Sequence, residues 1–233
     1  MPGARQFLRG AYATGLALMI SACTSSLQQR GEWQPLFDGA STRGWHNAGK
    51  TGIDPRWQAI DGALVLTAPG GGDIVSDAQF DDFELELEWQ LAPGGNSGLF
   101  YRAMDADPVW QRAAEYQLLD DAAAEDRFVP SHRAGAVYDL VAPESAVLRP
   151  AGEYNHARVI ACGPQVEHWL NGVRVAAYTV GSDDWKQRLA ASKFAGQPDF
   201  AAARGGHIGL QDHGAVVRMR NARVRTLSEC AVR

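Results

Sequence analysis

Two short segments of the sequence alternate polar side chains with large apolar ones. In an extended strand, successive side chains point to opposite faces of a sheet. Asn96 and Arg102 then share one face of the first segment, and Glu115 and Gln117 share one face of the second. If these polar faces coincide, they form a floor of fixed hydrogen-bond donors and acceptors that suits a polyhydroxylated ligand. The alternative is a solvated face whose Arg–Glu pair contributes little to stability.

Two histidines are further candidates for chemistry, because imidazole titrates near neutral pH and can act as an acid or a base. His213 follows Asp212 at the end of a predicted strand, on the same face as Gln211. His168 lies in another predicted strand, on the opposite face from Trp169. Each has a structural alternative: His213 could cap a turn, and His168 could be a packing residue.

These residues belong to a chain of short extended segments separated by turns. Asp61-Gly62 and Asn171-Gly172 each lie between apolar runs, which is a strong hairpin signal. The extended segments cover 57–66, 83–89, 96–102, 115–120, 136–141, 157–162, 166–170, 173–179, 207–211 and 216–227. About ten short strands with glycine-rich turns predict an all-β, two-sheet sandwich of the jelly-roll type.

The predicted sandwich also has long loops and one short helix. Residues 103–114 and 121–134 lack a clear periodicity, and loops of that length tend to be functional or disordered. Residues 183–191 carry the only convincing helical pattern. We therefore expect a sandwich with long loops and one short helix.

The most strictly alternating strand places Glu84, Glu86 and Glu88 in one acidic row. Such a row is most often a solvated sheet face. The alternative places Glu88 on the ligand floor beside Asn96, because only the short turn at 93–95 separates the two strands.

The composition is that of one domain with a sizeable core. The chain has 233 residues, of which 45% are hydrophobic and 21% charged. Its formal net charge is −5, and no basic run is interleaved with aromatic residues, so a nucleic-acid partner is not expected. Cys162 and Cys230 follow no metal-ligand spacing. They could form a disulfide in an oxidising compartment, but the sequence leaves this pairing open.

Residues 1–22 are predicted to be an export signal. Arg5 and Arg9 supply a positive start, and the residues from Ala11 to Ile20 form an apolar run. This run is shorter than the roughly 20 residues that span a bilayer. It therefore indicates a signal peptide and not a transmembrane helix.

The sequence Ile20-Ser21-Ala22-Cys23 resembles the bacterial lipobox, in which the cysteine is lipidated and becomes the mature N-terminus. Residues 23–31 are then a short polar tether. Thr24, in place of Asp, resembles lipoproteins that are sent on to the outer membrane. We therefore expect a cell-envelope protein that is anchored to the membrane through Cys23 and faces the periplasm.

The rest of the chain resembles one bacterial family over nearly its whole length. The matching blocks are Leu36-Phe37-Asp38-Gly39, Gly44-Trp45, 96–102, 115–120, Gly135-Ala136-Val137-Tyr138, Tyr154-Asn155, 168–172, Ser192-Lys193-Phe194 and 206–214. They occur in the order found in the bacterial 3-keto-disaccharide hydrolase domain family, formerly a domain of unknown function. The resemblance implies a concanavalin A-like jelly roll over residues 32–228, followed by a tail at 229–233.

The resemblance also implies action on glycosides whose C3 hydroxyl has been oxidised to a ketone. Such a ketone acidifies the proton at C2, so a base can remove it and the glycosidic oxygen at C1 can leave by elimination. Addition of water after elimination would give net hydrolysis, and the sequence leaves hydrolysis and elimination both open. This chemistry needs one base, donors for the enolate oxygen and an acid for the leaving group. It does not need the paired carboxylates of ordinary glycosidases.

The resemblance and the strand alternation together suggest roles for the candidate residues. His168 or His213 is expected to be the base at C2, and Glu115 the acid or an orienting partner. Arg102 and Gln117 are expected to hold the keto or enolate oxygen. The residues expected to bind substrate hydroxyls are Asn96, Tyr138, Lys193 and Gln211.

No cofactor is certain from the sequence. A divalent cation could polarise the ketone, with Glu115, His168 and His213 as conceivable ligands, although no spacing demands one. Two other functions remain open. A non-catalytic carbohydrate-binding lipoprotein would use the same fold, and a structural envelope protein would leave the polar floor without a purpose.

Overall fold

The computed structural model describes residue 1, residues 29–145 and 147–228, and residue 230. Cys23 and the predicted signal peptide, apart from Met1, lie outside the described residues. Gln29 and Arg30, predicted to belong to the tether, form a short strand instead, because they pair with Ser228 and Leu227. Within the described residues, no helix is long and apolar enough to cross a membrane.

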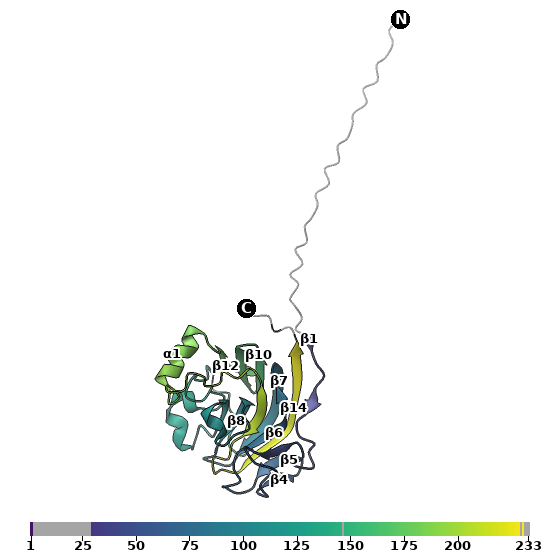
Figure 1. Ribbon diagram of the computed structural model, residues 1–233, viewed down its shortest axis with the longest axis vertical. Helices are drawn as coiled ribbons and strands as arrows, with labels where there is room; N and C mark the ends of the chain where they lie inside the picture. The colour runs from purple at the N-terminus through teal and green to yellow at the C-terminus, as the bar shows by residue number, and fades with distance from the viewer. Residues whose placement is uncertain (2–28, 146, 229, 231–233) are drawn as a thin grey trace.

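The described strands form two antiparallel sheets (Figure 1). The larger sheet has the order β12 (Val173–Thr179), β11 (Gln165–Leu170), β10 (Asn155–Cys162), β7 (Phe83–Leu91), β14 (Val217–Ser228), β5 (Ala63–Leu66) and β4 (Trp57–Ile60), with β1 (Gln29–Arg30) and β2 (Gln34–Pro35) paired to β14. The smaller sheet has the order β3 (Trp45–Asn47), β6 (Ile74–Phe80), β13 (Gly206–Leu210), β8 (Asn96–Ala103) and β9 (Ala114–Leu119). This arrangement confirms the predicted two-sheet sandwich.

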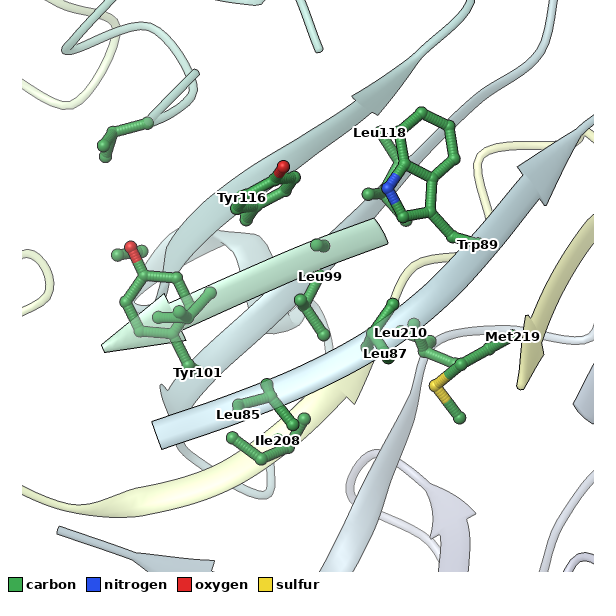
Figure 2. Close-up of a cluster of buried hydrophobic side chains, with 14 of the residues drawn as sticks. Leu85, Leu87, Trp89, Leu99, Tyr101, Tyr116, Leu118, Ile208, Leu210 and Met219 are labelled. Carbon is green, nitrogen blue, oxygen red and sulfur yellow. The ribbon is translucent and has the colours of Figure 1, made fainter. Parts of the chain in front are cut away.

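The core lies between the two sheets. Figure 2 shows Leu85, Leu87 and Trp89 of β7 in one cluster with residues of the smaller sheet such as Leu99 and Tyr101. Each of these five side chains is at most 2% exposed. Burial of one such side chain contributes roughly 1.5–3 kcal/mol, so the alternating apolar residues fix which face of each strand is inside. The opposite face of β8 and β9 is left for polar residues.

The predicted hairpin turns are confirmed. Asp61 and Gly62 have φ values of 52° and 77°, and Asn171 and Gly172 have values of 49° and 85°. Two consecutive positive φ values are typical of the type I′ turn, whose twist suits a hairpin. The strands that these turns join, β4 with β5 and β11 with β12, pair antiparallel.

Several elements differ from the expectation. The strands β3 and β6 are not among the predicted segments. The strand predicted at 136–141 is wrong: this segment makes only isolated bridges, Tyr116 with Val137 and Val137 with Val141. The long predicted loops contain short 3-10 helices, η1 (Val109–Gln111), η2 (Glu125–Phe128) and η3 (Pro130–His132). The helix predicted at 183–191 is confirmed as α1 (Asp183–Ala191), whose first turn is capped by the Ser182 hydroxyl at 3.1 Å from the Trp185 amide.

Glu88 does not lie beside Asn96. The turn at 93–95 is no hairpin, because β7 belongs to the larger sheet and β8 to the smaller one, so the chain crosses between sheets there. Glu88 accepts hydrogen bonds from Arg220 at 2.6 Å and from Asn221 at 2.9 Å. The acidic row of β7 is therefore a face that pairs with arginines. It is not simply the solvated face that the first interpretation expects, because Glu84 is only 1% exposed and pairs with Arg158 and Arg225.

A disulfide joins Cys162, the last residue of β10, to Cys230. It connects positions separated by 68 residues in the sequence, and so ties the C-terminal end of the described chain to the larger sheet. The pairing that the sequence left open is thereby made in the structure.

Candidate functional site

A recess of about 290 Å³ lies on the outer face of the smaller sheet. Its floor comes from β8, β9 and the end of β13, and its walls come from loops. The lining residues are Asn96, Trp110, Glu115, Gln117, Tyr138, Lys193, Gln211 and His213. The eight residues come from six separate segments of the chain. All of them except Trp110 were singled out from the sequence.

The floor is set by the register of β8 against β9. Gly98 is opposite Gln117 and Phe100 is opposite Glu115, so Glu115 and Gln117 project from the same face. The Gln117 amide donates to Asn96 Oδ1 at 2.9 Å. The predicted coincidence of the two polar faces is therefore correct for these residues.

Two buried amide oxygens of the floor are free to accept hydrogen bonds. Gln117 is 1% exposed and Gln211 is 8% exposed. Within the described part of the chain, neither Oε1 atom has a hydrogen-bond partner. Because an unpaired buried polar atom costs free energy, these two oxygens suit a ligand that brings hydroxyl donors.

Glu115 lies over Gly98, the one residue type that leaves room for it. A Cβ atom at position 98 would come within 2.6 Å of Glu115 Cδ. Burial raises the pKa of Glu115 from 4.5 to about 8; the Lys193 ammonium opposes this shift, and the carboxyls of Asp73 and Asp126 add to it. Glu115 therefore holds a proton at neutral pH and can donate it.

Lys193 brings a cation to the recess. Its Nζ lies 4.1 Å from the centre of the Tyr138 ring and 4.9 Å from that of Trp110, as cation–π contacts. Partial burial lowers the pKa of Lys193, whereas the neighbouring carboxyls, Glu115 first among them, oppose this. The ammonium thus lies against two aromatic rings at the edge of the recess.

Asp139 positions both Lys193 and the aromatic wall. Its Oδ2 accepts from the backbone amide of Lys193 at 2.7 Å, and its Oδ1 lies 3.1 Å from His132 Nε2. His132 stacks on Tyr138, with ring centres 4.4 Å apart. These contacts therefore hold the segments of His132, Tyr138 and Lys193 together beside the recess.

The turn that carries His213 is fixed by Asp212. One carboxylate oxygen of Asp212 accepts from the Gly214 amide at 3.0 Å, and the other from the Gly72 amide at 2.9 Å. The Asp212 amide donates to Asp73 at 2.9 Å. Burial raises the pKa of Asp73 from 3.8 to about 6. His213 is itself exposed, so a substrate can reach its ring.

Comparison with known proteins places this geometry in a family. The model of the 3-keto-alpha-glucoside-1,2-lyase-like domain matches residues 32–225. A 3-keto-disaccharide hydrolase of Bacteroides thetaiotaomicron is 31% identical over 225 residues, which is 82% of this chain and 77% of that protein. The chain belongs to this family. As a member of the 3-keto-alpha-glucoside-1,2-lyase-like family, it is a glycoside-cleaving enzyme, and the resemblance seen in the sequence is confirmed.

Solved structures agree with this assignment. A crystal structure of a candidate glycosyl hydrolase from Parabacteroides distasonis ATCC 8503 has a TM-score of 0.79 at 29% identity, covering 85% of this chain and 94% of that one. A second candidate glycosyl hydrolase from the same organism has a TM-score of 0.69 at 25% identity, covering 84% of this chain and 100% of that one. The jelly-roll fold of the family member described here is thus shared with both.

The structure does not place His168 in the recess of this family member. His168 is fully buried between the sheets, with Nε2 2.7 Å from the Tyr101 hydroxyl and Nδ1 3.0 Å from the Gly135 carbonyl oxygen. Burial lowers the pKa of His168 to about 4. Its assignment as the base is therefore wrong, and the packing alternative describes it correctly.

Arg102 is also absent from the recess. Its guanidinium donates to the carbonyl oxygens of Asp81 and Gly163 at 2.9 Å each, and to Asp82 at 3.1 Å. The reason is local: Arg102 has a φ of 51°, and the pairing of β13 with β8 shifts register beside it. The irregularity breaks the alternation on which the prediction rested, so the assignment of Arg102 to the enolate oxygen is wrong.

The ligand set conceived for a divalent cation fails for the same reason as the His168 assignment. Glu115 and His213 line the recess, but His168 lies inside the sandwich with both ring nitrogens hydrogen-bonded. Among the described residues, no three His, Cys, Asp or Glu side chains are grouped so as to hold a metal ion.

Two residues of the site were missed from the sequence. Trp110 lies on η1, inside a long loop, and η1 is anchored by Val109 packing in one cluster with Phe100. Asp73 precedes β6 in a glycine-rich segment. The only sequence feature that pointed to Trp110 was the length of the predicted loop at 103–114. Nothing in the sequence singled out Asp73.

Proposed function

We propose that this protein cleaves the glycosidic bond of 3-keto-glycosides by removing the C2 proton, eliminating the C1 substituent and then adding water. The observation that carries the proposal is the convergence of a protonated carboxyl, an ammonium and an accessible imidazole on one recess. Family membership supplies the substrate class. The named relative is a 3-keto-disaccharide hydrolase.

In this proposal His213 is the base. Its imidazole accepts the C2 proton, and the C–H electron pair forms the C2–C3 double bond of an enolate. His213 is the accessible histidine of the recess, held on a turn by Asp212, whereas His168 is buried. Imidazole is the side chain that most often acts as a general base in enzymes.

Lys193 takes the role that the sequence suggested for Arg102. As the C2 proton leaves, negative charge develops on the C3 oxygen, and a fixed ammonium stabilises it. Removing one such donor typically costs about 10²–10³ in kcat. The Oε1 atoms of Gln117 and Gln211, unpaired among the described atoms, accept hydroxyl hydrogens of the same sugar.

Glu115 completes the reaction as the acid. The enolate electrons re-form the ketone and build the C1–C2 double bond, while the C1–O bond breaks toward the glycosidic oxygen. That oxygen takes the proton of Glu115, which burial retains at neutral pH. Addition of water across C1 and C2 then gives the free 3-keto sugar, so the net reaction is hydrolysis.

We also propose export and lipid anchoring through Cys23. The lipobox-like sequence supports this location, and so does the Cys162–Cys230 disulfide, since such bonds persist in oxidising compartments and are rare in the cytosol.

A product assay tests the proposed activity. The full chain in detergent is incubated with 3-keto-trehalose, with and without a chelator, and free sugar is measured by chromatography. We expect released 3-keto-glucose and glucose, and no release from trehalose itself. Binding of 3-keto-trehalose without release of sugar would instead support a carbohydrate-binding lipoprotein. Loss of activity in the presence of the chelator would show that the reaction requires a metal ion.

A further inference from the structure

A second recess of about 370 Å³ adjoins the first. The two share Asn96 and His213, so they are neighbouring compartments of one surface depression. Ligand pockets have volumes of roughly 300–1,000 Å³. Because each compartment alone is near the lower end of that range, the pair together fits a ligand built of two units better than a single large one.

The walls of the two compartments differ in chemistry. The first holds the aromatic rings, the ammonium and the buried amides. The second is lined by small residues, such as Ala124 and Ala215, and by the carboxylates of Glu125 and Asp126. Carboxylate oxygens accept hydrogen bonds from the hydroxyls of a neutral sugar. They disfavour an anionic group, because like charges repel.

Asn96 links the compartments. Its Oδ1 accepts from Gln117 at 2.9 Å on the side of the first compartment. Its Nδ2 lies 3.4 Å from Asp126 Oδ2 on the side of the second. His213 occupies the same boundary. A bond that joins a unit in the first compartment to a unit in the second therefore lies beside the proposed base.

We propose that the second compartment is the subsite for the leaving sugar, and that the substrate is a 3-keto disaccharide whose second sugar carries no negative charge. This inference rests on the proposed function. The keto sugar occupies the first compartment, and the cleaved bond lies at the boundary marked by Asn96 and His213.

The size of the second compartment provides one test. Ala215→Leu adds bulk to its wall without touching the first compartment. Ala203→Leu is the matched control, because Ala203 lines a separate recess of about 590 Å³ that shares no residue with either compartment. Kinetics are measured with 3-keto-trehalose and with methyl 3-keto-α-glucoside, whose leaving group is only a methoxy group.

We expect Ala215→Leu to raise KM for 3-keto-trehalose at least tenfold and to leave the methyl glycoside within twofold. Ala203→Leu leaves both unchanged. Equal losses on both substrates, or no loss on either, would overturn the subsite while leaving the proposed function standing. A wild-type protein that cleaves neither substrate would refute the proposed function, and the subsite with it.

The charge of the second compartment provides the other test. The wild-type protein is compared on two 3-keto-glucosides whose second sugar is glucose or glucuronate. We expect kcat/KM to favour the neutral one at least tenfold, and Asp126→Asn to reduce that preference at least threefold. A preference that is absent, or that Asp126→Asn leaves unchanged, contradicts the assignment.

Discussion

Glu115 is the residue on which the proposed chemistry depends most, because a carboxyl acts as an acid only if it keeps its proton at the working pH. The β9 strand places it on the outer face of the smaller sheet, yet the loops above make it 6% exposed. Its neighbours Asp73 and Asp126 add negative charge, so the ammonium of Lys193 only partly offsets the effect of burial.

The raised pKa predicts how activity depends on pH. Because the acid must be protonated, kcat/KM falls as the pH rises through about 8. Glu115→Gln keeps the shape but cannot donate a proton, so we expect a loss of roughly 10²–10⁴-fold and disappearance of this alkaline limb. A pH–rate profile of the wild type and the variant measures the loss of activity and the disappearance of the alkaline limb.

Glu167→Gln is the control, since Glu167 pairs with Arg174 on the larger sheet, away from the recess. It is expected to keep the wild-type rate and profile. An active Glu115→Gln variant with the alkaline limb intact would show that another group is the acid.

The contact between Gly98 and Glu115 gives a second prediction. Gly98→Ala places a methyl group within 2.6 Å of Glu115 Cδ, so the carboxyl must move toward solvent. We expect activity to fall at least tenfold and the alkaline limb to move to lower pH, because a solvated carboxyl has a lower pKa.

Gly196→Ala is the matched glycine control, since a Cβ there meets no atom within 4 Å. Circular dichroism verifies that both variants are folded. Wild-type kinetics for a folded Gly98→Ala variant would mean that the position of Glu115 is not critical.

At the scale of the elements, sequence reasoning was accurate where one face of a strand is buried. The alternation in β7 and the hairpin signals at 61–62 and 171–172 determine local structure directly, because turn geometry and burial act on neighbouring residues. The same reasoning failed at Arg102. There a positive φ and a register shift break the alternation, and a single sequence carries no mark of such an irregularity.

His168 shows a second limit. Alternation gave the correct face of β11, but it could not tell an interior polar face from an exterior one. Three tyrosines, at 101, 116 and 178, surround His168 between the sheets. They provide a buried polar environment that only the packing of both sheets creates.

The disulfide between Cys162 in the larger sheet and Cys230 gives a prediction at the scale of the elements. Replacing Cys162 and Cys230 together by Ser removes a link between positions 68 residues apart. The chain-entropy model gives a loss of about 4 kcal/mol in the free energy of unfolding. Urea denaturation of the wild type and the double variant measures the difference in the free energy of unfolding.

Activity of the double variant at 20 °C is expected to remain, because the bond lies on the larger sheet and not in the recess. A loss of activity without a loss of stability would contradict this separation of roles.

At the scale of the whole molecule, the recess is assembled from segments far apart in the sequence. Trp110, Tyr138 and Lys193 come from loops that have no regular pattern, and they meet only because η1, Asp139 and α1 hold those loops over β8 and β9. The order of the family's blocks, recognised in the sequence, indicated Tyr138 and Lys193 before their convergence could be seen, but it did not indicate Trp110. Asp73 lay outside every such block and was missed.

The anchor proposed for the whole protein is tested by labelling. When the full chain is expressed with radiolabelled palmitate, the wild type is expected to carry the label in the membrane fraction. Cys23→Ser is expected to lose it, because the acylated thiol is gone. Cys230→Ser, which removes a different cysteine, retains it. Label on the Cys23→Ser protein would exclude this residue as the anchor.

The central claim is that cleavage proceeds through loss of the C2 proton to His213. The most direct measurement follows hydrogen at C2 by NMR while the full chain cleaves 3-keto-trehalose in D₂O, with free 3-keto-glucose incubated alone as the control. The account predicts that released 3-keto-glucose carries deuterium at C2 from the earliest times, and that His213→Ala abolishes both release and labelling. Release of 3-keto-glucose that still carries its original C2 proton would contradict it.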